Sequence, residues 1–264
     1  IRDVFRDREE RVRAVGIWSA VSAGGAAVGP LVGGFLVEHL WWGAVFLINV
    51  PIVLAIMPVA VRLLPESRAL KPPPWDGLAV ASTVVGILGL AFGFKEGARY
   101  GFIDPKVLVS LLAGIGCLIW FTRRQLAAPE PLLNVRLFAR REFSVAVCCV
   151  LLSMFGLVGI EFFGAQYLQL VLGLEPFDAA LRLLPLMLST LAGGLLAARV
   201  LGRLGTRWTI SLGLAGTGVG LVPMLALGLG DEYILLWPSF LVIGFSLEVA
   251  LVAANDVIIS SVPA

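Results

Sequence analysis

Two acidic residues, Glu161 and Glu248, lie deep inside long apolar stretches of the sequence. A charged carboxylate near the middle of a bilayer costs at least about 2.5 kcal/mol, so such residues usually have a function. A carboxyl group held away from bulk water can bind and release a proton, or pair with a cationic ligand. Both residues are therefore candidate proton or cation sites. The alternative is a protonated carboxyl that hydrogen-bonds to a neighbouring helix or reaches a lipid headgroup.

Several aromatic residues occur in the same stretch as Glu161. They are Phe155, Phe162, Phe163 and Tyr167. Aromatic rings can line a cavity and hold flat cations through cation–π contacts. Rings in membrane helices also serve as packing or interface residues. The sequence leaves both roles open.

The composition predicts which elements position these residues. Of the 264 residues, 59% are hydrophobic and 14% are charged, whereas soluble domains are about 25% charged. Apolar runs of roughly 20 residues, each long enough to cross a bilayer as a helix, recur along the chain. The predicted fold is therefore an all-α, polytopic membrane bundle. About eight spans are expected, at residues 14–37, 42–64, 76–95, 105–121, 143–170, 180–201, 208–229 and 233–255.

The basic residues indicate the orientation of these spans. If the first span runs outward, 16 of the 20 lysines and arginines fall in segments on one side of the membrane. The positive-inside rule makes that side cytoplasmic. We therefore expect a multi-pass protein of the plasma (inner) membrane, in contact with lipids, with both ends of this chain in the cytoplasm.

Two of the predicted cytoplasmic segments have distinctive sequences. Residues 125–142 contain PLLNVRLFARRE, in which apolar and basic residues alternate. This pattern is typical of a short basic helix on the membrane surface, although a plain linker is equally consistent with it. Residues 65–75 contain three consecutive prolines, which predict a stiff connection.

No catalytic chemistry is predicted. The sequence contains no HExxH, Gly-x-Ser-x-Gly or phosphate-cradling motif and no cysteine–histidine cluster spaced for a metal. Its three cysteines lie inside apolar spans, as expected for free thiols. We therefore expect neither an enzyme nor a nucleic-acid-binding protein, and no metal or cofactor. Glu38 and His39 fall in a predicted short outer loop, where ordinary solvation explains them.

Glycines are concentrated in the first span, in the sequence AGGAAVGPLVGG. Gly25, Gly29 and Gly33 are spaced four residues apart, which places them in one smooth stripe along a helix. Such stripes allow membrane helices to pack closely. Pro30 removes a backbone donor and is expected to bend the helix. A packing surface and a hinge are both consistent with this pattern.

The stretch GAAVGPLVGG, from Gly25 to Gly34, resembles the antiporter signature of drug efflux proteins in the major facilitator superfamily. WWGAVFLINVPI, KEGARYGF, QYLQLVLGLEPFDAALRLLP and NDVIISSVP are similar to segments of its fourteen-span drug:proton antiporter branch, and follow in the same order. The resemblance implies that the chain corresponds to helices five to twelve of that branch, with the first four and last two absent.

The resemblance also implies a domain organisation and an activity. Residues 1–64 would end the N-terminal bundle, 65–142 would hold two linker helices and the cytoplasmic segment, and 143–264 would belong to the C-terminal bundle. The intact protein would export lipophilic or cationic compounds by alternating access, driven by the proton gradient, with Gly25, Gly29, Pro30, Gly33 and Gly34 as the antiporter motif. A transporter of an endogenous solute or lipid, or a non-transporting remnant, are the alternatives.

ARVLGRLGTR resembles the second copy of the family's cytoplasmic gating-loop motif. Arg199, Arg203 and Arg207 would be its basic residues, and their spacing places them on one side of a helix. The family has an acidic residue before the central arginine, but this chain has Gly202 there. A charge relay through that position is therefore not expected to operate in the usual way. The arginines could also simply anchor the cytoplasmic end.

Overall fold

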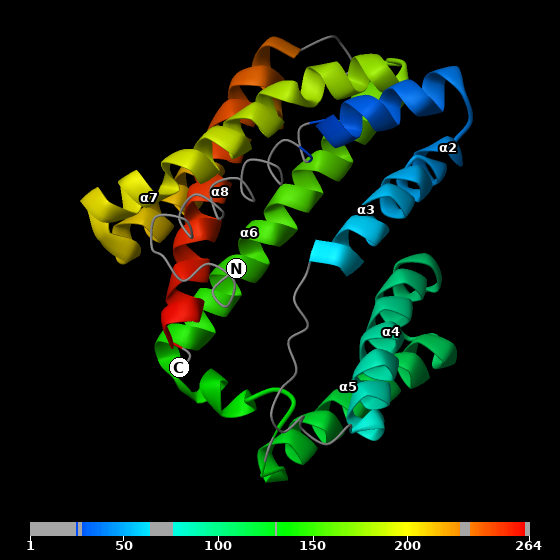
Figure 1. The fold of residues 1–264 in the computed structure, drawn as a ribbon, viewed down its shortest axis with the longest axis vertical. Coiled ribbons are helices and arrows are strands. Elements are labelled where there is room, and N and C mark those ends of the chain that lie inside the picture. The colour runs from blue at the N-terminus through cyan, green and yellow to red at the C-terminus, as the bar shows by residue number, and fades with distance from the viewer. Residues whose placement is uncertain (1–24, 26–27, 64–75, 130, 228–232, 262–264) are drawn as a thin grey trace. The chain divides into compact units, whose positions relative to one another are not determined.

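The computed structural model describes residues 25, 28–63, 76–129, 131–227 and 233–261. Every regular element in these residues is a helix, which confirms the predicted all-α class (Figure 1). Residues 28–39 are helical, and they are followed by short α2 (Ala44–Leu47) and by α3 (Asn49–Leu63). The proline-rich segment 65–75 lies outside the described residues, as does most of the first predicted span.

The remaining elements run from Gly77 to Ser261. They are α4 (Gly77–Tyr100), α5 (Pro105–Ala127), the 3₁₀ helix η1 (Val135–Ala139), α6 (Arg141–Gln166), the π-helical turn η2 (Tyr167–Val171), α7 (Pro176–Leu221), the 3₁₀ helix η3 (Val222–Ala226) and α8 (Tyr233–Ser261). The chain forms two compact units, one made of residues 1–64 and 145–264 and the other of residues 65–144. The assignment of these residues to two bundles and a linker stays a prediction.

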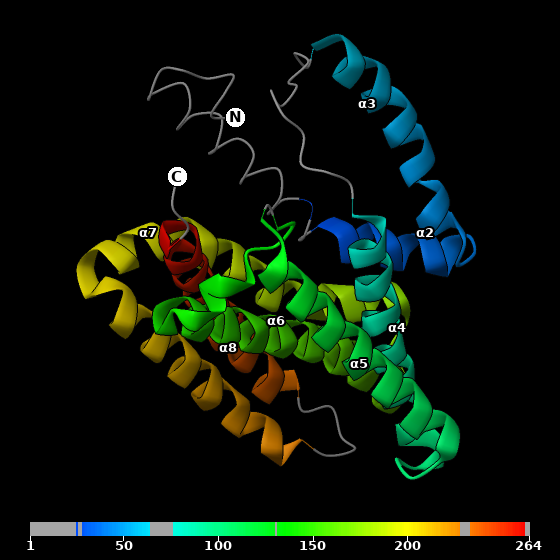
Figure 2. The same ribbon diagram turned by 90° about the horizontal axis from the view of Figure 1, so that it is seen from below.

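Six helical segments of the described chain are long and apolar enough to cross a membrane. One of them, Pro176–Ala226, is too long for a single span. Gly205 interrupts α7 with a φ of 74° and a ψ of 163°, and the chain turns back there (Figure 2). Because only glycine adopts such angles at little cost, Gly205 divides α7 into the two spans that the sequence predicted.

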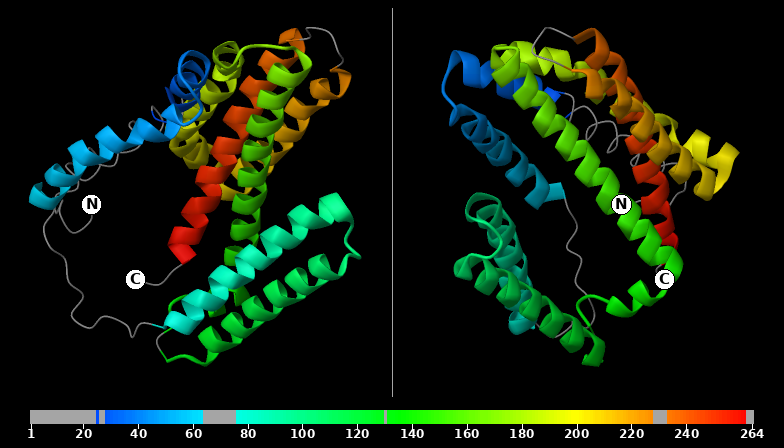
Figure 3. Two further views of the ribbon diagram at one scale, coloured as in Figure 1. Left: turned by 90° about the vertical axis from the view of Figure 1, so that its right-hand side faces the viewer. Right: turned by 180° about the vertical axis from the view of Figure 1, so that it is seen from behind.

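In the second unit, α4 and α5 form an antiparallel hairpin (Figure 3). Glycines bring the two backbones together. A Cβ atom at Gly114 would lie 2.9 Å from the backbone nitrogen of Leu90, and one at Gly89 would lie 3.0 Å from the carbonyl oxygen of Ser110. The hydrophobic effect contributes little to the association of helices in lipid, and close packing through small residues is one of its main causes there.

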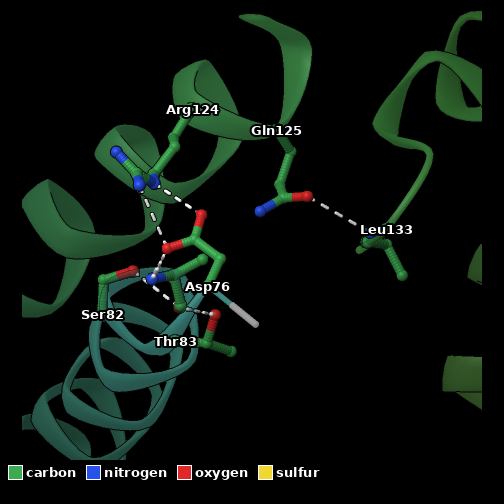
Figure 4. A network of polar contacts seen from close by, with 7 residues as sticks. Asp76, Ser82, Thr83, Arg124, Gln125 and Leu133 are labelled. Carbon is green, nitrogen blue, oxygen red and sulfur yellow. Dashed lines mark hydrogen bonds and ion pairs between the residues drawn. The ribbon is translucent and has the colours of Figure 1, made fainter. Parts of the chain in front are cut away.

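An ion pair joins the two open ends of this hairpin (Figure 4). Arg124 donates from Nε to Oδ2 of Asp76 at 2.6 Å and from Nη2 to Oδ1 at 3.1 Å. Asp76 also caps α4, since its Oδ1 accepts the N–H of Ala79. The hydrogen bond from Arg124, reinforced by that of Ala79, holds the pKa of the Asp76 carboxyl below its usual range.

This ion pair predicts a pH dependence. A lowered pKa in the folded state stabilises the fold above the usual carboxyl pKa, and the contribution is lost as the pH falls through about 4. Thermal unfolding in detergent should therefore show a steeper loss of stability between pH 6 and pH 3 for the wild type than for Asp76→Asn. The difference should be small because the pair is solvent-exposed. Arg124→Gln should reduce the slope as Asp76→Asn does; an unchanged slope in both variants would contradict the assignment.

The predicted basic surface helix within residues 125–142 is only partly present. α5 extends through Ala127, and the rest contains one short 3₁₀ helix, η1, rather than a longer amphipathic helix. Side-chain contacts tie this segment to α5: Gln125 accepts the N–H of Leu133, and Arg136 donates to the carbonyl oxygen of Leu126. These polar contacts with α5 explain why the alternating pattern does not form a continuous helix.

The first unit has its core between α6, α7 and α8. The core is apolar, and Leu168, Leu186, Phe240 and Ile243 are fully buried. α7 and α8 pack along much of their length, through Gly213, Gly220 and Gly244 among others. Ser189 of α7 donates to the carbonyl oxygen of Phe240 in α8 at 3.1 Å. The same hydroxyl lies 2.8 Å from the carbonyl oxygen of Leu186 in its own helix, so its hydrogen is shared between an acceptor in α7 and one in α8.

Candidate functional site

An apolar cavity of about 410 Å³ lies between α6, α8 and the residues from the end of α7 through η3 to Leu227. Its wall carries no charged side chain. Twelve residues line it, namely Phe155, Gly156, Gly159, Ile160, Phe163, Gly164, Tyr167, Leu221, Met224, Leu227, Leu236 and Phe240. Aromatic rings and glycines of one helix thus face Phe240 and aliphatic side chains of other elements across a space large enough for a small organic molecule.

The α6 wall of the cavity follows from helical periodicity. Its residues recur every three or four positions from Phe155 to Tyr167 and so occupy one face of the helix. Gly156, Gly159 and Gly164 leave room on this face, and a Cβ atom at Gly159 would meet nothing within 4 Å. The glycines therefore create the space, and the rings of Phe155 and Phe163 border it.

At Tyr167 the α-helix changes to a π-helical turn, in which the N–H of Leu172 donates to the carbonyl oxygen of Tyr167. Turns of this kind are often found at functional sites, because they shift the residues beyond them to a new face. Phe240, opposite on α8, is fully buried. Tyr167 and Phe240 therefore face each other from two different elements of the cavity wall.

Three of the four aromatic residues predicted to line a cavity do so: Phe155, Phe163 and Tyr167. Phe162 is not part of the wall, although its ring contacts that of Phe163 edge to face. The sequence did not indicate the partners on other elements, such as Met224, Leu236 and Phe240. Apolar side chains of this kind have no distinguishing pattern, and long-range packing alone brings them together.

Glu161 does not face this cavity. It lies two residues from both Gly159 and Phe163, which is about 200° of rotation around a helix, and its side chain is exposed. Glu161 therefore lies away from the cavity that Phe155, Phe163 and Tyr167 line, and its role as a proton or cation site stays a prediction. The side chain points to a face of α6 that also carries exposed Leu151 and Val158.

Glu248 is half-buried where α8 packs on α7. A Cβ atom at Gly193 would lie 3.1 Å from the Cβ of Glu248, and one at Gly194 would lie 3.5 Å from its Oε1. The paired glycines thus form the surface on which this carboxyl rests. Within the described residues, no cation or hydrogen-bond donor contacts it. Its protonation would change the charge directly at the contact between the two helices.

The glycine stripe of the first span has no neighbour in the described residues. Cβ atoms at Gly25, Gly29 and Gly33 would each meet nothing within 4 Å. Gly34 is different, because a Cβ atom there would lie 2.8 Å from the carbonyl oxygen of Pro176. Close packing by the stripe itself stays a prediction, whereas close packing by Gly34 is present. Pro30 lies within the helical residues 28–39.

The three arginines of the predicted gating loop are all exposed. Arg199 and Arg203 lie on one helical segment, but Gly205 interrupts the helix before Arg207. The three residues therefore do not form a single row along one helix, as their spacing had suggested. The glycine that breaks the helix was visible in the sequence, but nothing there distinguished it from the many glycines that remain helical.

Neither metal nor disulfide chemistry is indicated in this part of the chain. No group of histidine, cysteine, aspartate and glutamate residues among those described could hold a metal ion. Cys117, Cys148 and Cys149 are free thiols. The features of the described residues that could serve a function are thus an apolar cavity, the carboxyl groups of Glu161 and Glu248, and close contacts between helices.

Comparison with known proteins adds independent support for a transport function. The family model of the Major Facilitator Superfamily matches residues 1–264. The chain is 34% identical over 264 residues to the methyl viologen resistance protein SmvA of Salmonella typhimurium, with 100% of the chain and 53% of that protein aligned. It is also 34% identical over 264 residues to the multidrug efflux pump LfrA of Mycolicibacterium smegmatis, with 100% of the chain and 52% of that protein aligned.

A third relative is the tetracenomycin C resistance and export protein of Streptomyces glaucescens. It is 32% identical over 256 residues, which cover 95% of the chain and 47% of that protein. The chain thus spans about half the length of the curated relatives it matches.

Proposed function

Because this chain belongs to the major facilitator superfamily, we propose that it is part of a multidrug efflux transporter that exports lipophilic or cationic compounds from the cytoplasm. The observation that carries this proposal is the similarity along the whole chain to proteins named for drug resistance and efflux. The apolar, aromatic cavity is consistent with cargo of this class. No catalytic group is required, since transport needs only binding and conformational change.

The cavity would bind the apolar body of the cargo. Its wall offers aromatic faces and aliphatic side chains but no fixed charge, so it would accept molecules of varied shape without demanding a particular polar pattern. A positive charge on the cargo would then have to be balanced elsewhere. Glu161 and Glu248 are the membrane carboxyls available for that role.

Transport would proceed by alternating access, in which two bundles rock about a central site. Proton uptake from outside would neutralise a carboxyl that also favours the cargo, and would thereby promote release. Glu248 is the better placed carboxyl for this coupling, because it lies within the contact between α7 and α8 rather than on an exposed face.

A substitution at Gly159 tests the cavity. Gly159→Leu introduces a side chain into open space without a clash at its Cβ, so the fold should persist while the cavity shrinks. We expect the affinity of the purified protein for a lipophilic cationic dye to fall about tenfold or more, the effect of a changed hydrophobic pocket. Gly116→Leu is the control, since Gly116 is equally free of neighbours but belongs to α5. Equal dye affinity in both variants and the wild type would exclude this cavity as the site.

An endogenous lipid is the second candidate cargo, since the uncharged wall would suit an acyl chain equally well. Deleting the gene in its own host distinguishes the drug cargo from the lipid cargo. Increased dye retention with unchanged lipid export supports the drug cargo, and the opposite result supports the lipid.

A further inference from the structure

The end of the helix at residues 28–39 contacts the beginning of α7, 139 positions further along the chain. The N–H of Phe177 donates a hydrogen bond to Oε2 of Glu38 at 3.1 Å. The rings of Phe35 and Phe177 meet edge to face, with centroids 6.2 Å apart. Gly34 lies against the backbone of Pro176. Three contacts of different kinds thus join the same two segments.

The electrostatics of the two helix ends favour this arrangement. A carboxylate in the last turn of its own helix faces the negative end of that helix, which is unfavourable. The first turn of α7 presents unpaired N–H groups and the positive end of a dipole. Glu175, at the N-cap position of α7, makes no capping hydrogen bond with its side chain. Glu38 thus lies in the last helical turn rather than in the predicted loop, and although its side chain is exposed, as expected, it also caps α7.

The glycine at position 34 makes the contact possible. A Cβ atom there would lie 2.8 Å from the carbonyl oxygen of Pro176 and 3.1 Å from the Cα of Phe177, distances that only a glycine permits. Glu38 follows one helical turn later and so lies on the same side. His39 stacks on Phe35, with ring centroids 4.4 Å apart, and supports the ring that touches Phe177.

We propose that Glu38 is a positioning residue of the transport cycle: its hydrogen bond to Phe177 holds the end of residues 28–39 against the start of α7 and keeps this end of the transport pathway closed. The proposal rests on the proposed transport function. The predicted organisation assigns residues 1–64 and 143–264 to different bundles, so a rocking motion that opens this end must break the contact. Glu38 stabilises this contact through the charge of its carboxylate, and Gly34 permits it because glycine has no side chain.

Chemical crosslinking tests the contact without relying on transport. Val37 and Asp178 are exposed neighbours of Glu38 and Phe177. Val37 and Asp178 would each be replaced by cysteine in the whole gene of the host cell. Cys117, Cys148 and Cys149 would be changed to alanine. A short bifunctional thiol reagent then reports how often the two segments are together. Immunoblots of the membrane fraction correct the yield for the amount of protein.

We expect Glu38→Ala to lower the crosslinking yield about fivefold, the effect of losing a typical helix cap. Glu38→Gln, which retains an acceptor but no charge, should give an intermediate yield. Glu175→Ala is the matched control, because it removes a carboxylate from the same helix end without removing a hydrogen bond, and its yield should equal that of the parent. Equal yields in Glu38→Ala and Glu175→Ala would overturn the proposal.

Dye efflux measured in the same cells separates this inference from the proposed function. If efflux occurs in the parent and Glu38→Ala alters both efflux and crosslinking, both proposals are supported. If efflux occurs but neither quantity responds to Glu38→Ala, the role of Glu38 is refuted and the transport function stands. If the parent exports no dye while crosslinking depends on Glu38, the contact is supported and the export function is refuted.

Discussion

Replacing Gly213 with leucine is expected to separate α7 from α8 and to prevent the first unit from packing. A Cβ atom at this position would lie 2.7 Å from the carbonyl oxygen of Ser246 and 2.8 Å from the Cβ of Ala250. These neighbours are a backbone oxygen and a Cβ atom of α8, so no side-chain rotation can move them away. Overpacking of a tight core costs about 1–3 kcal/mol, and rigid neighbours should place this variant at or above the upper end.

The measurement is the amount of folded protein in the membrane, followed by thermal unfolding in detergent. Gly218→Leu is the matched control: Gly218 lies in the same helix, but a Cβ atom there would meet nothing within 4 Å. Gly213→Leu should lower the unfolding temperature by several degrees or abolish accumulation, while Gly218→Leu should behave like the wild type. Because leucine has a higher helix propensity than glycine, similar losses in the two variants could not come from propensity and would contradict a special role of the α7–α8 contact at Gly213.

The second large effect is expected for Glu248→Gln. If this carboxyl carries the proton, an amide that cannot ionise should uncouple export from the proton gradient while leaving the helix contact almost unchanged in shape. Gradient-driven dye efflux should fall about 5- to 150-fold, the range of coupling between two linked sites. Binding of a neutral lipophilic dye at equilibrium should persist, because the apolar cavity does not include Glu248; the affinity for a cationic dye should fall if this carboxyl also balances the charge of the cargo.

Glu161→Gln provides the comparison for this experiment. Glu161 lies on an exposed face of α6, away from the cavity, and its replacement should reduce proton-dependent efflux less than Glu248→Gln does. The pH profile of efflux is the deciding measurement, since a lost proton carrier flattens the profile. A flat profile in Glu161→Gln together with a normal one in Glu248→Gln would reverse the assignment of the two residues.

The membrane spans could be predicted because length and hydropathy are local properties of the sequence. The predicted starts of the spans at residues 76 and 105 agree with the starts of α4 and α5, where Asp76 and Asp104 cap the helices and Pro105 occupies the first turn. The two spans on either side of Gly205 could be predicted from their distinct apolar runs, although nothing in the sequence marked Gly205 itself as the turn. In each case a few adjacent residues carried the signal.

The arrangement around the cavity could not be predicted in the same way. The α6 residues follow a helical period, but the sequence left open whether Phe155, Phe163 and Tyr167 line a cavity or only pack against neighbouring helices. Met224 and Phe240 belong to other helices, and only tertiary packing brings them to the wall. The π-helical turn at Tyr167 has no sequence pattern that distinguishes it from an ordinary helix.

Glu38 illustrates a different limit. In the sequence it is an acidic residue near a predicted turn, for which solvation is the simplest explanation. Its partner, Phe177, contributes a backbone N–H. Every residue type except proline has this group, so the sequence does not show which residue will donate it. Gly34 gave the better signal, because it belongs to a motif of closely spaced glycines, but the motif did not indicate which of them touches another segment.

Dye transport into everted membrane vesicles tests the central claim most directly. The vesicles come from host cells that carry or lack the gene, and an imposed proton gradient, acidic inside, supplies the driving force. If the chain is part of a proton-coupled drug exporter, a lipophilic cationic dye should accumulate only in vesicles from cells with the gene, and dissipating the gradient should release it. Equal accumulation in vesicles with and without the gene would contradict the account.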